Sequence, residues 1–134
     1  MRRILTVAAV LALGSTAAFA DNMINTDGVK VDGNMVTVPS VMADQDGYVV
    51  IHAVKDGAPV VPASIGHASI KQGENTNVMI ESDYPLADGE DYLFMLHDET
   101  NGNDTYDFGA GSTDVDTPTM MNDEPVTVMY KAGM

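Results

Sequence analysis

The chain has 134 residues, and its twenty acidic residues outweigh six lysines and arginines, for a formal net charge of −14. This balance argues against nucleic acid and anionic membrane surfaces as partners, because both require basic patches. Cysteine is absent, which excludes a disulfide framework, a thiolate metal site and a thiol nucleophile. Stability must therefore come from a hydrophobic core, for which the length suffices.

The first twenty residues have the parts of a secretory signal peptide. A basic start at residues 1–3 precedes an apolar run at 4–13, and small residues end in Ala18-Phe19-Ala20. The apolar run is shorter than the roughly 20 residues that span a bilayer. We therefore expect cleavage after Ala20, no membrane insertion afterwards, and a periplasmic or extracellular protein. The exported part, 21–134, is expected to form a single β-sandwich domain with a net charge of −16, from four lysines and twenty acidic residues.

The exported part shows the short apolar alternations and turn residues of β-strands, with no sustained helical period. The Pro at position 62 favours an edge position for the strand that contains it. Short strands about ten residues apart predict an all-β fold with little helix, an antiparallel sandwich or barrel of about seven strands. In chain order, the predicted strands are 35–38, ending at Pro39, then 48–54, 60–65, 77–81, 91–97 and 126–130.

Two of these strands, 48–54 and 91–97, are apolar on both faces near their centres. Successive side chains of a strand point to opposite faces. Strands that are apolar on both faces are typical of central positions with cover on each side. We expect both strands to lie in the middle of the sheet.

Residues 98–125 have weak strand signal and are long for a loop in a compact domain. Oxygen-bearing side chains recur at alternate positions there, as in calcium-binding loops. Asp104 stands where such loops carry Gly, and Ala110 stands where they carry a bidentate Glu. The alternative is an Asx-rich turn whose side chains bond nearby backbone amides without an ion. The candidate Ca²⁺ ligands are the side chains of Glu99, Asn101, Asn103 and Asp107 and the backbone carbonyl of Thr105.

A second candidate site is made of soft and nitrogenous ligands. Nine methionines and three histidines follow the predicted cleavage site. Met95 and His97 lie two residues apart on one predicted strand and so share a face. Thioether and imidazole together suit copper, and His52 completes the candidate copper set. The alternative is that these are ordinary core residues, since methionine commonly fills gaps in cores.

Enzymatic signatures are missing from the sequence. It has no G-x-S-x-G nucleophile elbow, no H-E-x-x-H zinc motif and no glycine loop in a strand-to-helix setting. Carboxylates are plentiful, but nothing singles out a catalytic pair. We therefore predict that the protein is not an enzyme.

Several segments together resemble a known family. They are GYVVIHA at 47–53, SIGH at 64–67, MLHD at 95–98, TNGN at 100–103 and YDF at 106–108. In this order they are similar to a small secreted domain family of unknown function, common in haloarchaea and in exported bacterial proteins. The resemblance covers about residues 36–130 and implies an immunoglobulin-like sandwich in an extracytoplasmic setting, with no established activity. Family members often carry Asp at the position of Glu99 and Gly at that of Asp104.

These observations predict an exported, non-catalytic β-sandwich module with an interaction or structural role. Its partner would be an unidentified protein or cell-surface component, and its candidate cofactor is a weakly bound Ca²⁺ in the 99–107 loop. The alternative function is that of a periplasmic Met/His copper-binding protein.

Overall fold

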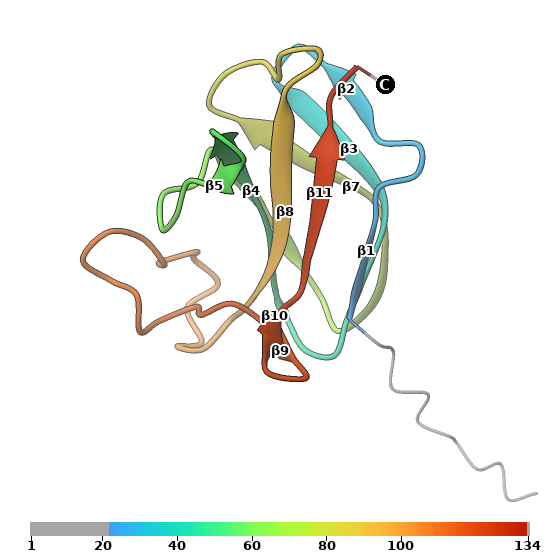
Figure 1. Cartoon of the computed structure of the whole chain (residues 1–134). Helices are drawn as coiled ribbons and strands as arrows, with labels where there is room; N and C mark the ends of the chain where they lie inside the picture. Colours follow the sequence, from blue (N-terminus) through green and yellow to red (C-terminus); the bar gives the residue numbers. More distant parts are fainter. Residues whose placement is uncertain (1–21, 134) are drawn as a thin grey trace, which may run out of the picture.

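The computed structural model describes residues 22–133, so the predicted signal peptide and its cleavage site lie outside the described residues. Within that range the chain forms eleven strands and no helix. The predicted all-β class is therefore confirmed (Figure 1).

Nine of the strands within 22–133 belong to one antiparallel sheet. Along its hydrogen-bonded path the order is β1 (Met23–Asn25), β3 (Met35–Ala43), β7 (Gly73–Ser82), β6 (Gly66–Ile70), β4 (Gly47–Lys55), β8 (Asp91–Asp98) and β11 (Thr127–Lys131). The remaining strands are β2 (Lys30–Asp32), paired with β3, β5 (Ala58–Pro59), paired with β4, and the hairpin of β9 (Met120–Met121) and β10 (Glu124–Pro125). The sheet folds over on itself, so the fold is an immunoglobulin-like sandwich close to a barrel (Figure 1).

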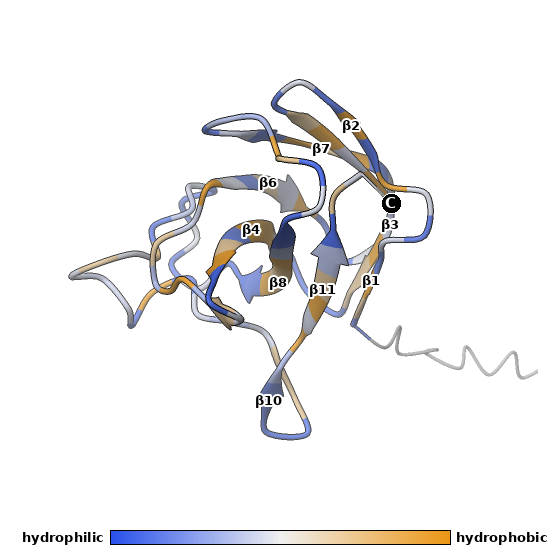
Figure 2. Ribbon diagram, turned by 45° about the horizontal axis from the view of Figure 1, so that its top comes forward, coloured by the Kyte–Doolittle hydropathy of each residue, from blue (hydrophilic) through white to orange (hydrophobic). Residues whose placement is uncertain are grey.

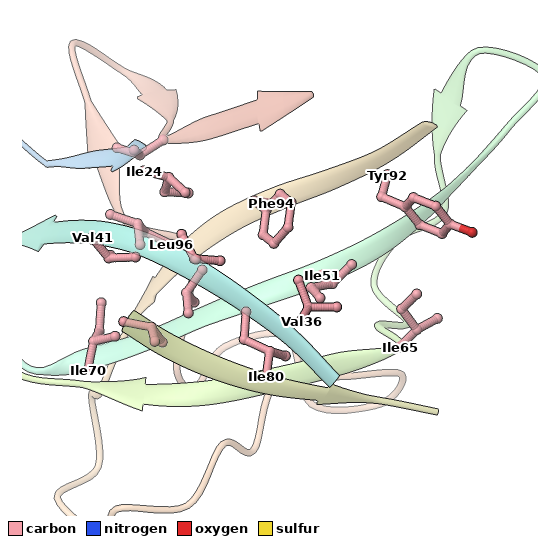
Figure 3. Close-up of a cluster of buried hydrophobic side chains, with 14 of the residues drawn as sticks. Ile24, Val36, Val41, Ile51, Ile65, Ile70, Ile80, Tyr92, Phe94 and Leu96 are labelled. Atoms are coloured by element: carbon pink, nitrogen blue, oxygen red, sulfur yellow. The ribbon is translucent and has the colours of Figure 1, made fainter. Parts of the chain in front are cut away.

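The hydrophobic core fills the space between the two halves of this sheet. Ile51 of β4 and Phe94 and Leu96 of β8 lie across from Val36 of β3 and Ile80 of β7 (Figure 3). All five side chains are at most 1% exposed. Burial of each large apolar side chain contributes roughly 1.5–3 kcal/mol relative to its exposure. Because the chain has no cysteine and therefore no disulfide, these residues supply much of its stability.

Strands β4 and β8 are central and buried on both faces, as predicted. They pair in a register that sets Tyr48 opposite His97 and Val50 opposite Met95. These four side chains point away from the core, yet each is at most 8% exposed. A second layer must therefore cover the outer face of β4 and β8.

One predicted strand boundary and one predicted strand are wrong. Strand β3 does not end at Pro39 but continues to Ala43, because the ladder with β7 resumes at Ser40 after passing the residue that has no backbone N–H. The segment 60–65 is a loop and not a strand. Its backbone meets β4 only at its ends, through Val60 N–H to Ala53 O and Ile65 N–H to Ile51 O, each 2.8 Å.

Six short strands were not predicted, namely β1, β2, β5, β6, β9 and β10. All three residues of β2 are exposed, so the segment lacks the apolar alternation by which strands are recognised. Figure 2 shows that hydrophobic residues recur along the long strands β3 and β4, whereas the turns carry mostly hydrophilic residues.

Candidate functional site

The second layer is formed by residues 99–119, called here the late loop, which lie on the β4 and β5 side of the molecule (Figure 1). Backbone hydrogen bonds attach the end of the late loop to β8, from Asp98 N–H to Thr117 O and from Thr119 N–H to Leu96 O, both 2.9 Å. The rings of Tyr106 and Phe108 pack on His97, with centroid distances of 5.2 and 4.8 Å. The late loop is therefore an ordered cover over the outer face of β8.

A buried carboxylate holds the two halves of the late loop together. Asp116 is fully buried, and its side chain accepts hydrogen bonds from the backbone N–H of Thr100 at 3.0 Å and of Asp107 at 2.7 Å. The Asp116 N–H in turn donates to the Thr100 hydroxyl at 2.7 Å. Hydrogen bonds to charged acceptors are about twice as strong as neutral ones. Asp116 thus orders an acidic segment of unusual length.

The predicted Ca²⁺ ligand Glu99 is engaged by protein donors. Its carboxylate accepts the Tyr48 hydroxyl at 2.6 Å and the backbone N–H groups of Asn101 and Gly102 at 2.9 and 3.0 Å. The Tyr48 hydrogen bond is the main cause that lowers the pKa of Glu99. Burial and the bond to Glu99 together raise the pKa of the Tyr48 hydroxyl. Glu99 therefore fastens the start of the late loop to the outer face of β4.

Three of the other predicted Ca²⁺ ligands converge on one point. The side-chain amides of Asn101 and Asn103 donate to the Asp107 carboxylate at 3.0 and 2.7 Å and lower its pKa. Thr105 donates its backbone N–H to Asn103 Oδ1 at 2.9 Å. The geometry is that of the Asx-rich turn. For a cation, both amides would have to turn their oxygens inward, and Asn103 would lose its bond to Thr105.

The predicted copper ligands lie beneath the late loop and its neighbour, the segment 60–65. His52 is fully buried, and its Nδ1 donates to Ala63 O at 2.8 Å and Val60 O at 3.1 Å. His97 is 1% exposed, and its Nδ1 donates to Asp116 O at 2.6 Å. A carbonyl can only accept, so Nδ1 of each ring carries a proton, and in the neutral form of either ring Nε2 carries a lone pair.

Neither Nε2 atom has a hydrogen-bond partner, although both are buried. Burial lowers the pKa of His97 to about 4, so this ring is neutral at physiological pH. Leaving a buried polar atom unsatisfied costs about 1–3 kcal/mol. Two such atoms on neighbouring residues are unusual in a folded protein.

The two imidazole rings approach each other. Their centroids are 6.3 Å apart. In the β4–β8 register His52 lies opposite Leu93, four residues from the Tyr48–His97 pair, which corresponds to about 13 Å along the strands. The rings therefore lean toward each other over the Val50–Met95 pair, and Met95 lies between them in register.

A cavity of about 280 Å³ opens beside these residues. His52 and Met95 line it, together with apolar groups that include Val61, Phe108 and Pro118. The third histidine, His67, is exposed and packs against Tyr106 at the edge of the late loop, with a centroid distance of 4.8 Å. His67 therefore differs from the other two histidines in being exposed to solvent.

Sequence reasoning missed Asp116 and Tyr106. Both lie in a polar stretch in which nothing distinguishes the fully buried Asp116 from the exposed Asp114. Tyr106 is also notable because its buried hydroxyl has no hydrogen-bond partner.

Within residues 22–133, no three or more His, Cys, Asp or Glu side chains are grouped so that they could hold a metal ion. This finding does not concern a site in which methionine sulfur is one of the ligands.

In the same range, no helix has the length and apolar character required to cross a membrane.

Comparison with known proteins gives a family and two relatives. The family model described as "Domain of unknown function (DUF7282)" matches residues 22–132. Cell surface glycoprotein 1 of Haloarcula hispanica is 30% identical over 96 residues, which cover 72% of this chain and 10% of that protein. Cell surface glycoprotein 2 of the same organism is 30% identical over 104 residues, covering 70% of this chain and 11% of that protein. The chain therefore spans about a tenth of the length of these relatives. No solved structure matches the chain.

Proposed function

The chain belongs to the DUF7282 family, and we propose that it is a non-catalytic module that acts in interactions or in architecture at the cell surface. The observation that carries the proposal is the similarity, over most of this chain, to two proteins named cell surface glycoproteins. It supports an extracellular or surface location, the second of the two locations expected from the sequence, periplasmic or extracellular.

The structure of the outer face agrees with a non-catalytic role. The histidines are the side chains best suited to proton transfer near neutral pH. Two of the three histidines, His52 and His97, are at most 1% exposed, and each Nδ1 is bonded to a backbone carbonyl, so a polymeric substrate has no access to these two; His67 is exposed. The strongly acidic composition favours a soluble module whose contacts depend on ionic strength.

The interaction role is tested by cross-linking of intact cells with a membrane-impermeant, amine-reactive reagent. All four lysines of the described chain are exposed, so the module presents reactive amines at several places (Lys30, Lys55, Lys71 and Lys131). We expect covalent adducts with another surface protein, identified by mass spectrometry. Recovery of links within this chain alone would contradict the role.

A weakly bound Ca²⁺ in the 99–107 loop is the finer part of the proposal. The convergence of Asn101, Asn103 and Asp107 supports it, and the existing hydrogen bonds oppose it. With this incomplete set of ligands we expect a Kd on the order of 10⁻⁴ to 10⁻³ M. Ca²⁺ binding is tested by a thermal melt of the protein after EDTA treatment, which is repeated with millimolar Ca²⁺ and with Mg²⁺ at matched ionic strength. A rise specific to Ca²⁺ that is lost in Asp107→Ala supports the site, and equal rises with both salts contradict it.

A further inference from the structure

The strongest unexplained feature of the outer face is the pair of buried imidazoles with free Nε2 atoms. Their Nδ1 edges are held by backbone carbonyls of two different segments, the 60–65 loop and the late loop. Metal-ligating histidines commonly have this arrangement, in which the second nitrogen donates to a carbonyl and so fixes the tautomer of the ligating one.

We propose that His52 and His97, through Nε2, and Met95, through its thioether sulfur, bind a single Cu(I) ion beneath the late loop. The proposal goes beyond the surface role and does not depend on it. It rests on the two unpartnered Nε2 atoms, the approach of the two rings, and the position of Met95 between them.

The distance between the rings agrees with this ligand set. Two imidazoles bound through Nε2 to one ion, with nitrogen–metal distances of about 2.0 Å, have centroids about 5 Å apart at a tetrahedral N–metal–N angle and about 6.3 Å apart at a linear one. The observed 6.3 Å corresponds to the near-linear arrangement. A wide N–metal–N angle is one that low-coordinate Cu(I) accepts, and Met95 supplies a third, soft ligand from the same face of β8.

The surroundings select a monovalent soft ion over a divalent one. The ligands are all neutral, and the cavity beside them is walled by apolar groups such as Val61 and Phe108. Burying charge in such a place is costly, and more so for two charges than for one. The nearest buried carboxylate, that of Asp116, is occupied by two backbone N–H groups of the late loop. Within residues 22–133 the hard or borderline ligands that Zn²⁺ requires are not grouped.

The test is anaerobic titration of the purified protein with Cu(I) in competition with a chromophoric Cu(I) chelator. We expect one ion per chain. The substitution His97→Asn keeps a donor for Asp116 O and removes Nε2, and His52→Asn does the same for Ala63 O. Both should abolish competition with the chelator. Met95→Leu conserves volume and should weaken binding by about tenfold or more.

Matched controls separate this site from binding at the surface. His67→Asn and Met79→Leu change the same residue types at exposed positions and should leave the affinity unchanged. Ag(I) is a redox-stable analogue of Cu(I), and its binding can be followed by NMR in the wild-type protein without any substitution. One equivalent should shift the ring nitrogens of His52 and His97 and the Met95 methyl, and not those of His67. No Cu(I) bound against the chelator, or Ag(I) shifts confined to exposed methionines such as Met79 and Met129, would overturn the proposal.

Discussion

Removal of the Asp116 carboxylate should loosen the late loop and lower the stability of the whole protein. In Asp116→Ala, the backbone N–H groups of Thr100 and Asp107 lose an acceptor that they now reach at 3.0 and 2.7 Å. A hydrogen bond to a charged group contributes about 1.5–3 kcal/mol. Because the freed N–H groups can partly reach water, we expect a loss of about 2–4 kcal/mol in the free energy of unfolding. For a domain of this size that is a fall in Tm of roughly 8–16 °C.

The measurement is a thermal melt of the variant beside Asp114→Ala. Asp114 is exposed two residues away in the same loop, so its removal makes the same change in net charge without touching the buried carboxylate. Hydrogen exchange reports the mechanism, since the amides of Thr100 and Asp107 should be protected in the wild-type protein and exchange quickly in Asp116→Ala. If both variants melt alike and the two amides stay protected, the late loop is held by something other than Asp116.

Three further predictions concern the sheet and its histidine. Phe94→Ala removes a fully buried core ring and should cost about 3–5 kcal/mol in urea unfolding. A Cβ at Gly47 would collide with the His97 carbonyl oxygen, so Gly47→Ala should lower the Tm strongly, whereas Gly109→Ala, with open space around it, should not. In the metal-free protein, NMR titration should place the pKa of His97 near 4. That value lies below the roughly 6.5 of an unfolded histidine, so stability should fall by about 3 kcal/mol as pH drops from 6.5 to 4. In the His97→Asn variant this contribution is missing, so over the same drop in pH the variant should lose about 3 kcal/mol less stability than the wild-type protein. A pKa of His97 near 6.5 would show that burial does not lower it.

The parts of the fold that could be predicted are those in which apolar alternation is continuous. Strands β4 and β8 are apolar on both faces, and this pattern predicted their central position and two-sided cover. Strand β2 is fully exposed, so hydrophobic pattern could not reveal it. Pro39 predicts a strand end because a missing N–H disrupts a ladder, but β3 passes this point and resumes pairing with β7.

The candidate site was predictable to the extent that strand geometry fixes it. The two-residue spacing of Met95 and His97 predicted a shared face, and the β4–β8 register brings His52 to it. What covers that face could not be predicted, because it depends on Asp116, a single buried carboxylate in a polar loop. The alternation of oxygen-bearing residues at 99–107 predicted a Ca²⁺ loop, with an Asx-rich turn as the alternative. The hydrogen bonds there are those of the turn, and Ca²⁺ binding stays a prediction.

The location of this module at the cell surface is tested most directly by labelling intact cells with a membrane-impermeant amine reagent and comparing them with lysed cells. Lys30, Lys55, Lys71 and Lys131 are all exposed in the folded protein, so each reports on access to the outside. We predict that peptides containing these lysines are modified to the same extent in intact and lysed cells. Labelling that appears only after lysis would contradict a location at the cell surface.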